Sequence, residues 1–359
     1  MKNKVLLIGP MPKPINGVSI CNELITNKST SFKVNYIDTA NKSFNEKAGS
    51  FSFQKVFSSL KPYFKILKIL KSDIVYMTIG QTFYGVLKYY PFFLLSKIFR
   101  KEIVIHIHGN FLGKQYKELS GFKKNIFKYI LKKSDKGIVL SESLKPNLTP
   151  FLSEKKIHIL YNFVEKQLVN ISINEVKSKN TSQLEIVYLS NLMTEKGIFN
   201  LLHALKILNK NKINFTANIA GNIDNTIKDE VIQLIESIDG AHYVGVVRGN
   251  EKRKLFLNAN TFVFPTYYKM EGQPIAILEA MAAGNIILTT KHAGIPDIFS
   301  EKNGFYIEKK SPKDIAEKLS SLSSKLDSFK PMMFKNQLYV KENYTEPIFL
   351  SNLAAIFKQ

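Results

Sequence analysis

The chain has 359 residues, 45% of them hydrophobic, which is enough for two domains with cores of their own. Its single cysteine, Cys21, excludes an intramolecular disulfide and fits a reducing compartment, and we interpret it as a small core residue of the first helix. No uninterrupted apolar run reaches the roughly 18–20 residues that a membrane-spanning helix needs, and VLLIG near the start is too short for a signal peptide. We expect a cytoplasmic protein, peripheral at the inner face of the cell membrane.

The formal charge of +22 is concentrated in the first half of the chain. Residues 1–165 contain 27 Lys and Arg against 10 Asp and Glu, whereas residues 166–359 contain 24 against 19. Such an excess indicates an anionic partner. Nucleic acid is one such partner, but only three of the 51 basic residues are Arg, the residue that base readout favours, and no nucleic-acid motif is present. An anionic membrane surface or a phosphate-bearing lipid fits better.

Strand and helix patterns alternate along the first half, which predicts a parallel sheet with right-handed crossovers and ligand sites at the carboxyl ends of its strands. The predicted strands are Lys4–Gly9, Lys33–Asp38, Asp73–Ile79, Glu102–His108, Gly137–Ser141 and Lys156–Asn162, and the predicted helices are one from near Val18, Gln54–Lys71, Tyr84–Arg100 and Gly121–Lys133. The loop from Pro10 to Gly17 before the first helix has the form of a phosphate cradle, although many α/β proteins begin in this way.

Two histidines stand at the carboxyl end of one predicted strand, in the sequence HIHGN. Alternation places His106 and His108 on one face of the sheet, with Asn110 just beyond them. The pair could ligate a metal, but the sequence offers no evident third ligand, so hydrogen-bonded histidines at a strand end are the alternative. We expect no metal.

Two predicted helices of the first half, Tyr84–Arg100 and Gly121–Lys133, are both basic and aromatic. In the second, GFKKNIFKYILKK, an apolar stripe is surrounded by lysines. Such a helix either packs its stripe on a core with a solvated flank or rests on anionic lipid.

Residues 166–183 are polar and rich in Asn, Ser and Lys, and we place a linker there between a first domain, 1–165, and a second, 184–340. In the second domain, Lys196 and Gly197 stand at the N-terminus of a helix from Ile198, which is an anion site with a cation added. Strands are predicted at Leu184–Leu189, Asn214–Gly221, Thr261–Pro265 and Asn285–Thr290, and helices at 311–326 and 331–358.

The sequence around Glu271 combines a strand, a Tyr-rich loop and a helix that contains a second acid, Glu279. Pro274 suits the first helical turn, where its missing N–H costs nothing. Glu271 would then lie at the helix N-terminus beside outward-pointing N–H groups, which hold an anion or a ring of hydroxyls. The residues that would supply these N–H groups are Gly272, Gln273 and Ile275.

This E-x7-E region, with the Glu-Ala-Met-Ala-Ala-Gly helix after it, resembles that of the family-4 retaining glycosyltransferases of GT-B fold. HIHGN and PKPINGVS also resemble that family's acceptor motif and N-terminal glycine loop, with Asn16 where a first glycine is common. Asn tolerates positive φ, so this substitution is mild. The resemblance implies two Rossmann-like domains with parallel sheets facing across a cleft, the first binding acceptor and the second binding a nucleotide sugar. It also implies a last helix, 341–359, that packs back on the first domain.

The resemblance further implies roles for single residues. Lys196 and backbone N–H groups, including those of the Gly17 loop, would bind the donor diphosphate, so that neither a metal nor another cofactor is required. Glu271 and the N–H groups after it would hold the donor sugar, and Glu279 the ribose hydroxyls. His108 would lie near the transferred sugar. The family's usual clamp arginine is replaced by Asn191, and Arg248 could supply the guanidinium from elsewhere.

We therefore expect a retaining transferase that moves a hexose-type sugar from a UDP- or GDP-linked donor to a saccharide acceptor. The basic first half favours an acceptor linked to a polyprenyl diphosphate, as in capsule, O-antigen or exopolysaccharide assembly. A GT-B phosphorylase acting on phosphate or a phosphosugar stays open, as does a non-catalytic module that binds sugar nucleotides. A nucleic-acid-binding protein is the most distant alternative.

Overall fold

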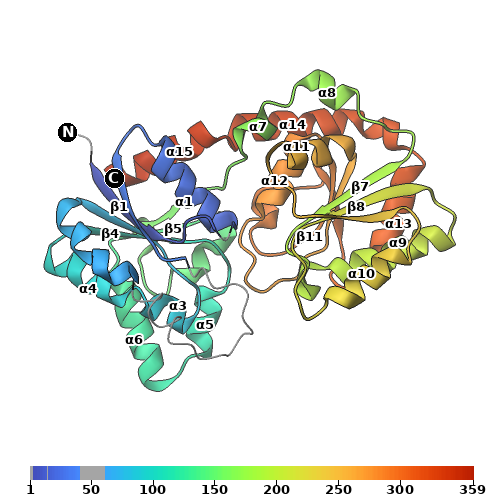
Figure 1. Ribbon diagram of the computed structural model, residues 1–359. Coiled ribbons are helices and arrows are strands. Elements are labelled where there is room, and N and C mark those ends of the chain that lie inside the picture. The colour runs from blue at the N-terminus through green and yellow to red at the C-terminus, as the bar shows by residue number, and fades with distance from the viewer. Residues whose placement is uncertain (1–2, 14, 41–60) are drawn as a thin grey trace. The chain divides into compact units, whose positions relative to one another are not determined.

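The computed structural model describes residues 3–13, 15–40 and 61–359, and these form two compact units. The first unit comprises residues up to Asn162 together with Pro347–Gln359, and the second comprises Phe163–Glu346. Each unit contains a six-stranded parallel sheet with helices on both of its faces, as Figure 1 shows. Among the described residues, no helix is both long and apolar enough to cross a membrane.

The first sheet has the strand order β2-β1-β3-β4-β5-β6, so the direction of winding reverses between β1 and β3. Its three central strands, β1, β3 and β4, are almost completely buried, which is why they appear in the sequence as continuous apolar runs. The elements are β1 (Lys4–Gly9), α1 (Gly17–Lys28), β2 (Lys33–Asp38), η1 (Lys61–Lys71), β3 (Ile74–Thr78), α3 (Phe83–Leu87), α4 (Tyr90–Ile98), β4 (Glu102–Ile107), α5 (Leu112–Glu118), α6 (Gly121–Lys132), β5 (Lys136–Val139), η2 (Glu142–Asn147), η3 (Glu154–Lys156) and β6 (Ile157–Ile159).

The second sheet has the order β12-β11-β10-β7-β8-β9, with its reversal between β7 and β10. Helices α9, α10 and α13 lie on one face of this sheet and α11, α12 and α14 on the other (Figure 1). The elements are α7 (Lys166–Val169), α8 (Ile173–Lys177), β7 (Leu184–Leu189), η4 (Thr194–Lys196), α9 (Ile198–Lys210), β8 (Phe215–Ala220), α10 (Lys228–Glu236), β9 (Ala241–Gly245), α11 (Gly249–Asn258), β10 (Thr261–Phe264), α12 (Ile275–Ala282), β11 (Ile286–Thr290), η5 (Ile295–Asp297), β12 (Gly304–Ile307), α13 (Pro312–Ser323), η6 (Leu326–Phe329), α14 (Lys330–Asn343) and α15 (Glu346–Lys358).

Two long predicted helices are each divided at a proline. Pro91 falls in the first turn of α4, and because a proline cannot continue a helix from the preceding turn, residues 84–100 form α3 and α4 instead of one helix. Pro347 likewise separates α14 from α15. Only α15 joins the first unit, where Phe357 packs edge-on against Phe32 and Tyr76.

The predicted helix Gln54–Lys71 is described only from Lys61, and there it is a 3₁₀ helix, η1. Residues 54–60 lie outside the described part of the chain. The 3₁₀ geometry has three residues per turn, so the eleven residues of η1 present three straight rows of side chains.

The predicted linker, residues 166–183, differs from the structure, in which the second unit already begins at Phe163. This segment forms α7 and α8, and α8 begins with a capping box between Ser172 and Glu175. Lys179 is buried, and its ammonium donates to the carbonyl oxygens of Phe256 and Leu257 at 2.7 and 3.0 Å. A polar composition resembles that of a linker, but here the polar groups satisfy the end of another helix.

Candidate active site

The second unit brings together two residues that are 75 positions apart in the sequence. Lys196 follows β7 and Glu271 follows β10, the two neighbouring strands between which the sheet reverses direction. The carboxyl ends of strands on either side of such a reversal form the crevice in which α/β proteins bind ligands. The Nζ atom of Lys196 lies 2.7 Å from Oε2 of Glu271.

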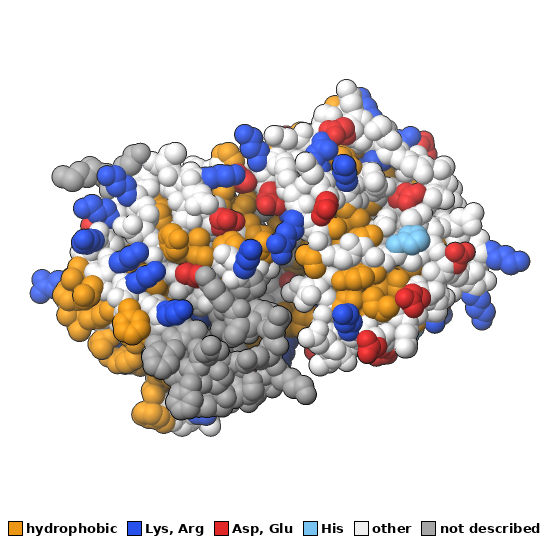
Figure 2. Space-filling view, in the orientation of Figure 1, with side chains coloured by type: hydrophobic (Ala, Val, Ile, Leu, Met, Phe, Trp, Pro, Cys, Tyr) orange, Lys and Arg blue, Asp and Glu red, His pale blue; other side chains and the backbone are white. Residues whose placement is uncertain are grey.

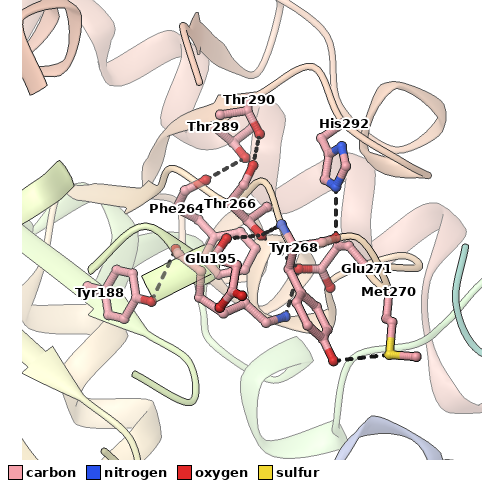
Figure 3. Close-up of polar contacts among 11 residues, drawn as sticks. Tyr188, Glu195, Phe264, Thr266, Tyr268, Met270, Glu271, Thr289, Thr290 and His292 are labelled. Atoms are coloured by element: carbon pink, nitrogen blue, oxygen red, sulfur yellow. Dashed lines mark hydrogen bonds and ion pairs between the residues drawn. The ribbon is translucent and has the colours of Figure 1, made fainter. Parts of the chain in front are cut away.

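Glu271 is buried and Lys196 is largely so, with 8% and 14% of their side chains exposed. The hydroxyl of Thr266 donates to the same Glu271 oxygen at 3.1 Å, and the ammonium of Lys196 lies 4.8 Å from the ring centre of Tyr268. Figure 3 shows Thr266 and Tyr268 beside Glu271, with the hydroxyl of Tyr268 directed at Met270. The site therefore holds a largely enclosed lysine, and a second anion can supplement or replace its partner Glu271.

Gly197 fixes where the helix after Lys196 begins. Its φ of +84° lies in the left-handed region, and a Cβ atom there would meet the carbonyl oxygen of Pro265 at 2.3 Å. Only glycine fits both conditions. The N-terminus of α9, thirteen residues long, is thereby held against the end of β10 and beside the Lys196 cation.

The loop before α12 is anchored from a second segment of the chain. The His292 ring contacts the carbonyl oxygen of Tyr268 through Nε2 at 2.8 Å, and Gly294 donates its N–H to the carbonyl of Gly272 at 2.9 Å (Figure 3 shows the His292 contact). Burial lowers the pKa of His292, and Lys309 donates to its Nδ1 at 3.1 Å. The neutral ring then donates from Nε2, so it braces the loop that carries Glu271.

Pro274 lies one residue earlier relative to the helix than we predicted. It is the N-cap of α12, with extended backbone, and the first helical residue is Ile275. Glu271 therefore stands in the loop before the helix and not at its terminus. Gly272, Gln273 and Pro274 are buried in this loop.

The second acid of the motif has a different partner. Glu279 is 4% exposed, and its Oε1 lies 2.5 Å from Nζ of Lys252 on α11. The same Nζ lies 2.5 Å from Oε2 of Glu165. Burial opposes the charge of Lys252, but the two carboxylates outweigh it and raise the pKa of the lysine. Burial raises the pKa of Glu279, and Lys252 counteracts that rise. The structure does not bring Glu279 and Glu271 into one cluster.

The two residues that we considered for the clamp position are both exposed. Asn191 lies between β7 and η4, and Arg248 caps the N-terminus of α11. Within the described part of the chain, Arg248 makes no hydrogen bond to Lys196 or Glu271.

In the first unit the structure places His106 and His108 together, with ring centres 3.9 Å apart. His106 is completely buried, and Tyr76 Oη lies 2.5 Å from its Nδ1. Burial lowers the pKa of His108 to about 3, and burial, with the neighbouring His108, lowers that of His106. Both rings are therefore neutral at physiological pH.

Asn110 forms a hydrogen bond with Asn147, whose side-chain amide donates to Oδ1 of Asn110 at 3.0 Å.

Gly17 is the exposed first residue of α1. Asn16 does not use the positive φ that an asparagine tolerates, because its φ is −151° and it acts as the N-cap of α1. Its Oδ1 accepts from the N–H of Ser19 at 3.0 Å, which closes a capping box.

Sequence reasoning missed Lys252 and Thr266. A lysine in NEKRK on a helix has the appearance of a solvated residue, and only the tertiary packing of α11 beside α12 reveals its burial. Thr266 carries a weak signal, since it directly follows the buried strand that leads to Glu271.

Residues 170–334 match the family model described as glycosyl transferases group 1. This range lies within the second unit. An uncharacterized glycosyltransferase of Methanocaldococcus jannaschii is 25% identical over 265 residues, 70% of this chain and 67% of that protein. The capsular polysaccharide biosynthesis glycosyltransferase CapM of Staphylococcus aureus is 26% identical over 226 residues, 58% of this chain and 59% of that protein.

Among solved structures, the Anabaena protein HepE in complex with UDP and glucose aligns with a TM-score of 0.75, over 99% of this chain and 100% of that one, at 14% identity. This likeness confirms the predicted GT-B fold class with its two Rossmann-like domains. The chain spans between 48% and 67% of the length of the first curated relatives that it matches.

Proposed function

We propose that this chain, whose residues 170–334 match the group 1 family, is a retaining glycosyltransferase that moves a hexose-type sugar from a nucleotide diphosphate sugar to a saccharide acceptor. The observation that carries the proposal is the buried Lys196–Glu271 pair at the reversal point of the second sheet. A cation and a carboxylate side by side, next to a helix N-terminus, offer complementary partners for a diphosphate and for sugar hydroxyls.

In this proposal Lys196 binds the diphosphate together with the N-terminus of α9. Transfer places negative charge on the departing diphosphate, and a fixed ammonium and helix dipole stabilise that charge without a metal ion. Exchanging Glu271 for the diphosphate costs little free energy, because the ammonium of Lys196 keeps an anionic neighbour throughout. The Gly17 loop, Asn191 and Arg248 are further candidates for the donor.

Glu271 is then free to accept hydrogen bonds from the donor sugar, with the N–H groups of the loop from Gly272 to Ile275 beside it. Thr266 keeps the carboxylate oriented. Glu279 is the candidate for the ribose hydroxyls, as the resemblance to the family implies.

On the acceptor side, His108 supplies a neutral imidazole, since burial lowers its pKa to about 3. A neutral ring nitrogen can accept a hydrogen bond from an incoming hydroxyl, whereas an imidazolium cannot. His106 and Asn110 complete the proposed acceptor set. Relatives such as CapM act in capsular polysaccharide biosynthesis, which supports a surface-polysaccharide acceptor.

The first unit also carries a surface suited to an anionic membrane. In η1 one row of side chains is exposed and apolar: Phe64, Leu67 and Leu70 are 80%, 66% and 47% exposed. The next row contains three exposed lysines, Lys65, Lys68 and Lys71. The third row packs inward, where the ring of Tyr63 stacks on that of Phe92 of α4 with their centres 5.4 Å apart. In Figure 2 apolar and basic side chains lie together over the region where Figure 1 places α4. Insertion of the apolar row with lysines at the headgroups fits a lipid-linked acceptor.

A thermal-shift screen of UDP, GDP, ADP and CMP, with and without EDTA, tests the donor site. We expect one nucleoside diphosphate to raise the Tm and EDTA to have no effect on this shift. UDP is the first candidate, because the structure of HepE is a complex with UDP. Glu271→Gln should lower kcat by about 10²-fold while nucleotide binding persists, and Glu195→Gln, an exposed acid nearby, should change neither. Absence of a shift with every nucleotide at millimolar concentration would overturn the proposal.

Sedimentation with lipid vesicles tests the membrane surface. Wild-type protein should bind phosphatidylglycerol vesicles more strongly than phosphatidylcholine vesicles, and a Phe64→Ser, Leu67→Ser, Leu70→Ser triple variant should lose this binding. Leu338→Ser changes a leucine of the second unit that is 56% exposed, and serves as the control. Equal binding of the triple variant and the wild type would exclude this surface.

A further inference from the structure

The first unit contains a cluster of three side chains that the proposed transfer does not explain. Cys21 on α1 and His106 and His108 from β4 and its end each offer a ligand atom, and these atoms all lie within 4.8 Å of one another. Among the described residues this is the one such group of histidine, cysteine and acidic side chains.

Two of the three side chains are buried, His108 is half-buried, and one ring nitrogen of each histidine lacks a hydrogen-bond partner. Cys21 and His106 are completely buried, and Nε2 of His106 and Nε2 of His108 make no hydrogen bond. A buried ring nitrogen without a partner costs about 1–3 kcal/mol, so two of them facing a thiol require an explanation.

We propose that Cys21, His106 and His108 form a binding site for a borderline or soft transition-metal ion such as Zn²⁺. The donor set of one sulfur and two imidazole nitrogens selects such ions over Mg²⁺ or Ca²⁺, which take oxygen ligands. Tetrahedral coordination with bonds of about 2.0–2.3 Å leaves ligand atoms about 3.4–3.6 Å apart. Side-chain rotations close the three atoms to that separation and leave the fourth position for solvent or a ligand.

Tyr76 provides the support that metal-binding histidines usually have. Its Oη lies 2.5 Å from Nδ1 of His106, so that this nitrogen can donate its proton to the tyrosine and leave Nε2 as the metal ligand. Ion binding releases the thiol proton of Cys21 to solvent and forms a metal–thiolate bond. This site lies outside the donor chemistry, but if the proposed acceptor role is right, a bound ion also withholds His108 from the acceptor.

The test is titration of tag-free, EDTA-treated protein with Cd²⁺, followed by the ultraviolet thiolate-to-metal charge-transfer band. Because Cys21 is the chain's single cysteine, this band reports on it alone. We expect one Cd²⁺ per chain with the band present, loss of the band in Cys21→Ser, and about 10-fold weaker binding in Tyr76→Phe. His158→Gln alters a half-buried histidine of the same unit whose Nε2 also lacks a hydrogen-bond partner, and it should leave binding unchanged.

Absence of the band in wild-type protein would overturn the site, as would equal Cd²⁺ binding by His106→Gln. The wild-type spectrum decides even if a variant fails to fold. The band can appear whether or not the protein transfers sugar, so failure of this proposal and failure of the proposed function are distinguishable.

Discussion

The two acids of the E-x7-E motif each hold a buried lysine, but in different settings. Glu271 pairs with Lys196, the last residue of the short 3₁₀ helix η4 after β7, at the carboxyl edge of the sheet and beside the Tyr268 ring. Glu279 pairs with Lys252 from the first turn of the helix α11, within a triad completed by Glu165. The first lysine ends a single 3₁₀ turn at the ligand-binding edge of the sheet, whereas the second belongs to a ten-residue α-helix.

This difference suggests that one pair serves exchange with a ligand and the other serves stability. A lysine with one carboxylate partner at the edge of the sheet can shift to a phosphate at little cost in free energy, whereas a lysine fixed between two carboxylates stabilises the packing of three segments. Whether the two lysines differ in this way can be tested by replacing each in turn and by measuring stability and donor binding separately.

Lys252→Met should have the largest effect. It leaves Glu279, 4% exposed, without a cation, and loss of one partner of a buried pair costs about 3–5 kcal/mol of unfolding free energy. Urea denaturation measures this, with Lys254→Met, an exposed lysine of the same helix, as the control. The Lys252→Met, Glu279→Met double variant should recover much of the loss. A loss below about 1 kcal/mol would contradict the structural role.

The sequence predicted one side of this comparison better than the other. Glu271, Lys196 and Gly197 follow buried strands and precede helices, so local order alone places them at one edge of a parallel sheet. Lys252 could not be found in this way, because nothing local distinguishes it from its exposed neighbour Lys254.

The same limit applies to the first unit. The HIHGN motif placed both histidines on one face, but Cys21 joins them only when α1 packs on that face of the sheet. The domain boundary was also predicted too late, since the polar run after 165 belongs to the second unit. Contacts between segments distant in sequence decide all three cases.

Lys196→Ala should give the next largest effect, on catalysis and not on fold. Removing a charge that stabilises the leaving diphosphate should lower kcat/KM by about 10²–10³-fold, equivalent to about 2.7–4 kcal/mol. Steady-state kinetics with the identified donor measures this, and Lys206→Ala, an exposed lysine on α9, is the control. Unchanged kinetics would remove Lys196 from the site and leave both pairs as structural.

Lys179 is a buried lysine of a third kind. Its ammonium donates to the backbone carbonyls of Phe256 and Leu257 and not to a carboxylate. Burial lowers its pKa to about 7, below the value of about 10.4 in the unfolded chain. Between these values the unfolded state binds more protons, so stability should rise with pH by about 1.4 kcal/mol per unit. Denaturation at a series of pH values above about 7 should show this slope in wild-type protein and in Lys177→Met, but not in Lys179→Met. If the unfolding free energy of Lys179→Met rises with pH as steeply as that of the wild type, the pH dependence comes from other groups.

Arg248→Ala should have the smallest effect. Arg248 is exposed at the start of α11, and an exposed cation contributes about 0–1 kcal/mol to an ionic contact, so affinity for the nucleoside diphosphate should fall by no more than a few-fold. Nucleoside affinity should not change, because the guanidinium would contact phosphate. Calorimetric titration of both ligands measures the difference, with Arg100→Ala, an exposed arginine of the first unit, as the control.

The two outcomes have different meanings for the Lys196 pair. A selective loss for the diphosphate would mean that Arg248 moves to the phosphate on binding and replaces the guanidinium that Asn191 does not provide. Equal affinities would mean that Lys196 and the N-terminus of α9 carry the diphosphate without an arginine. In that case Lys196 would carry more of the binding energy, and the loss of kcat/KM in Lys196→Ala should lie near the upper end of the expected range, about 10³-fold.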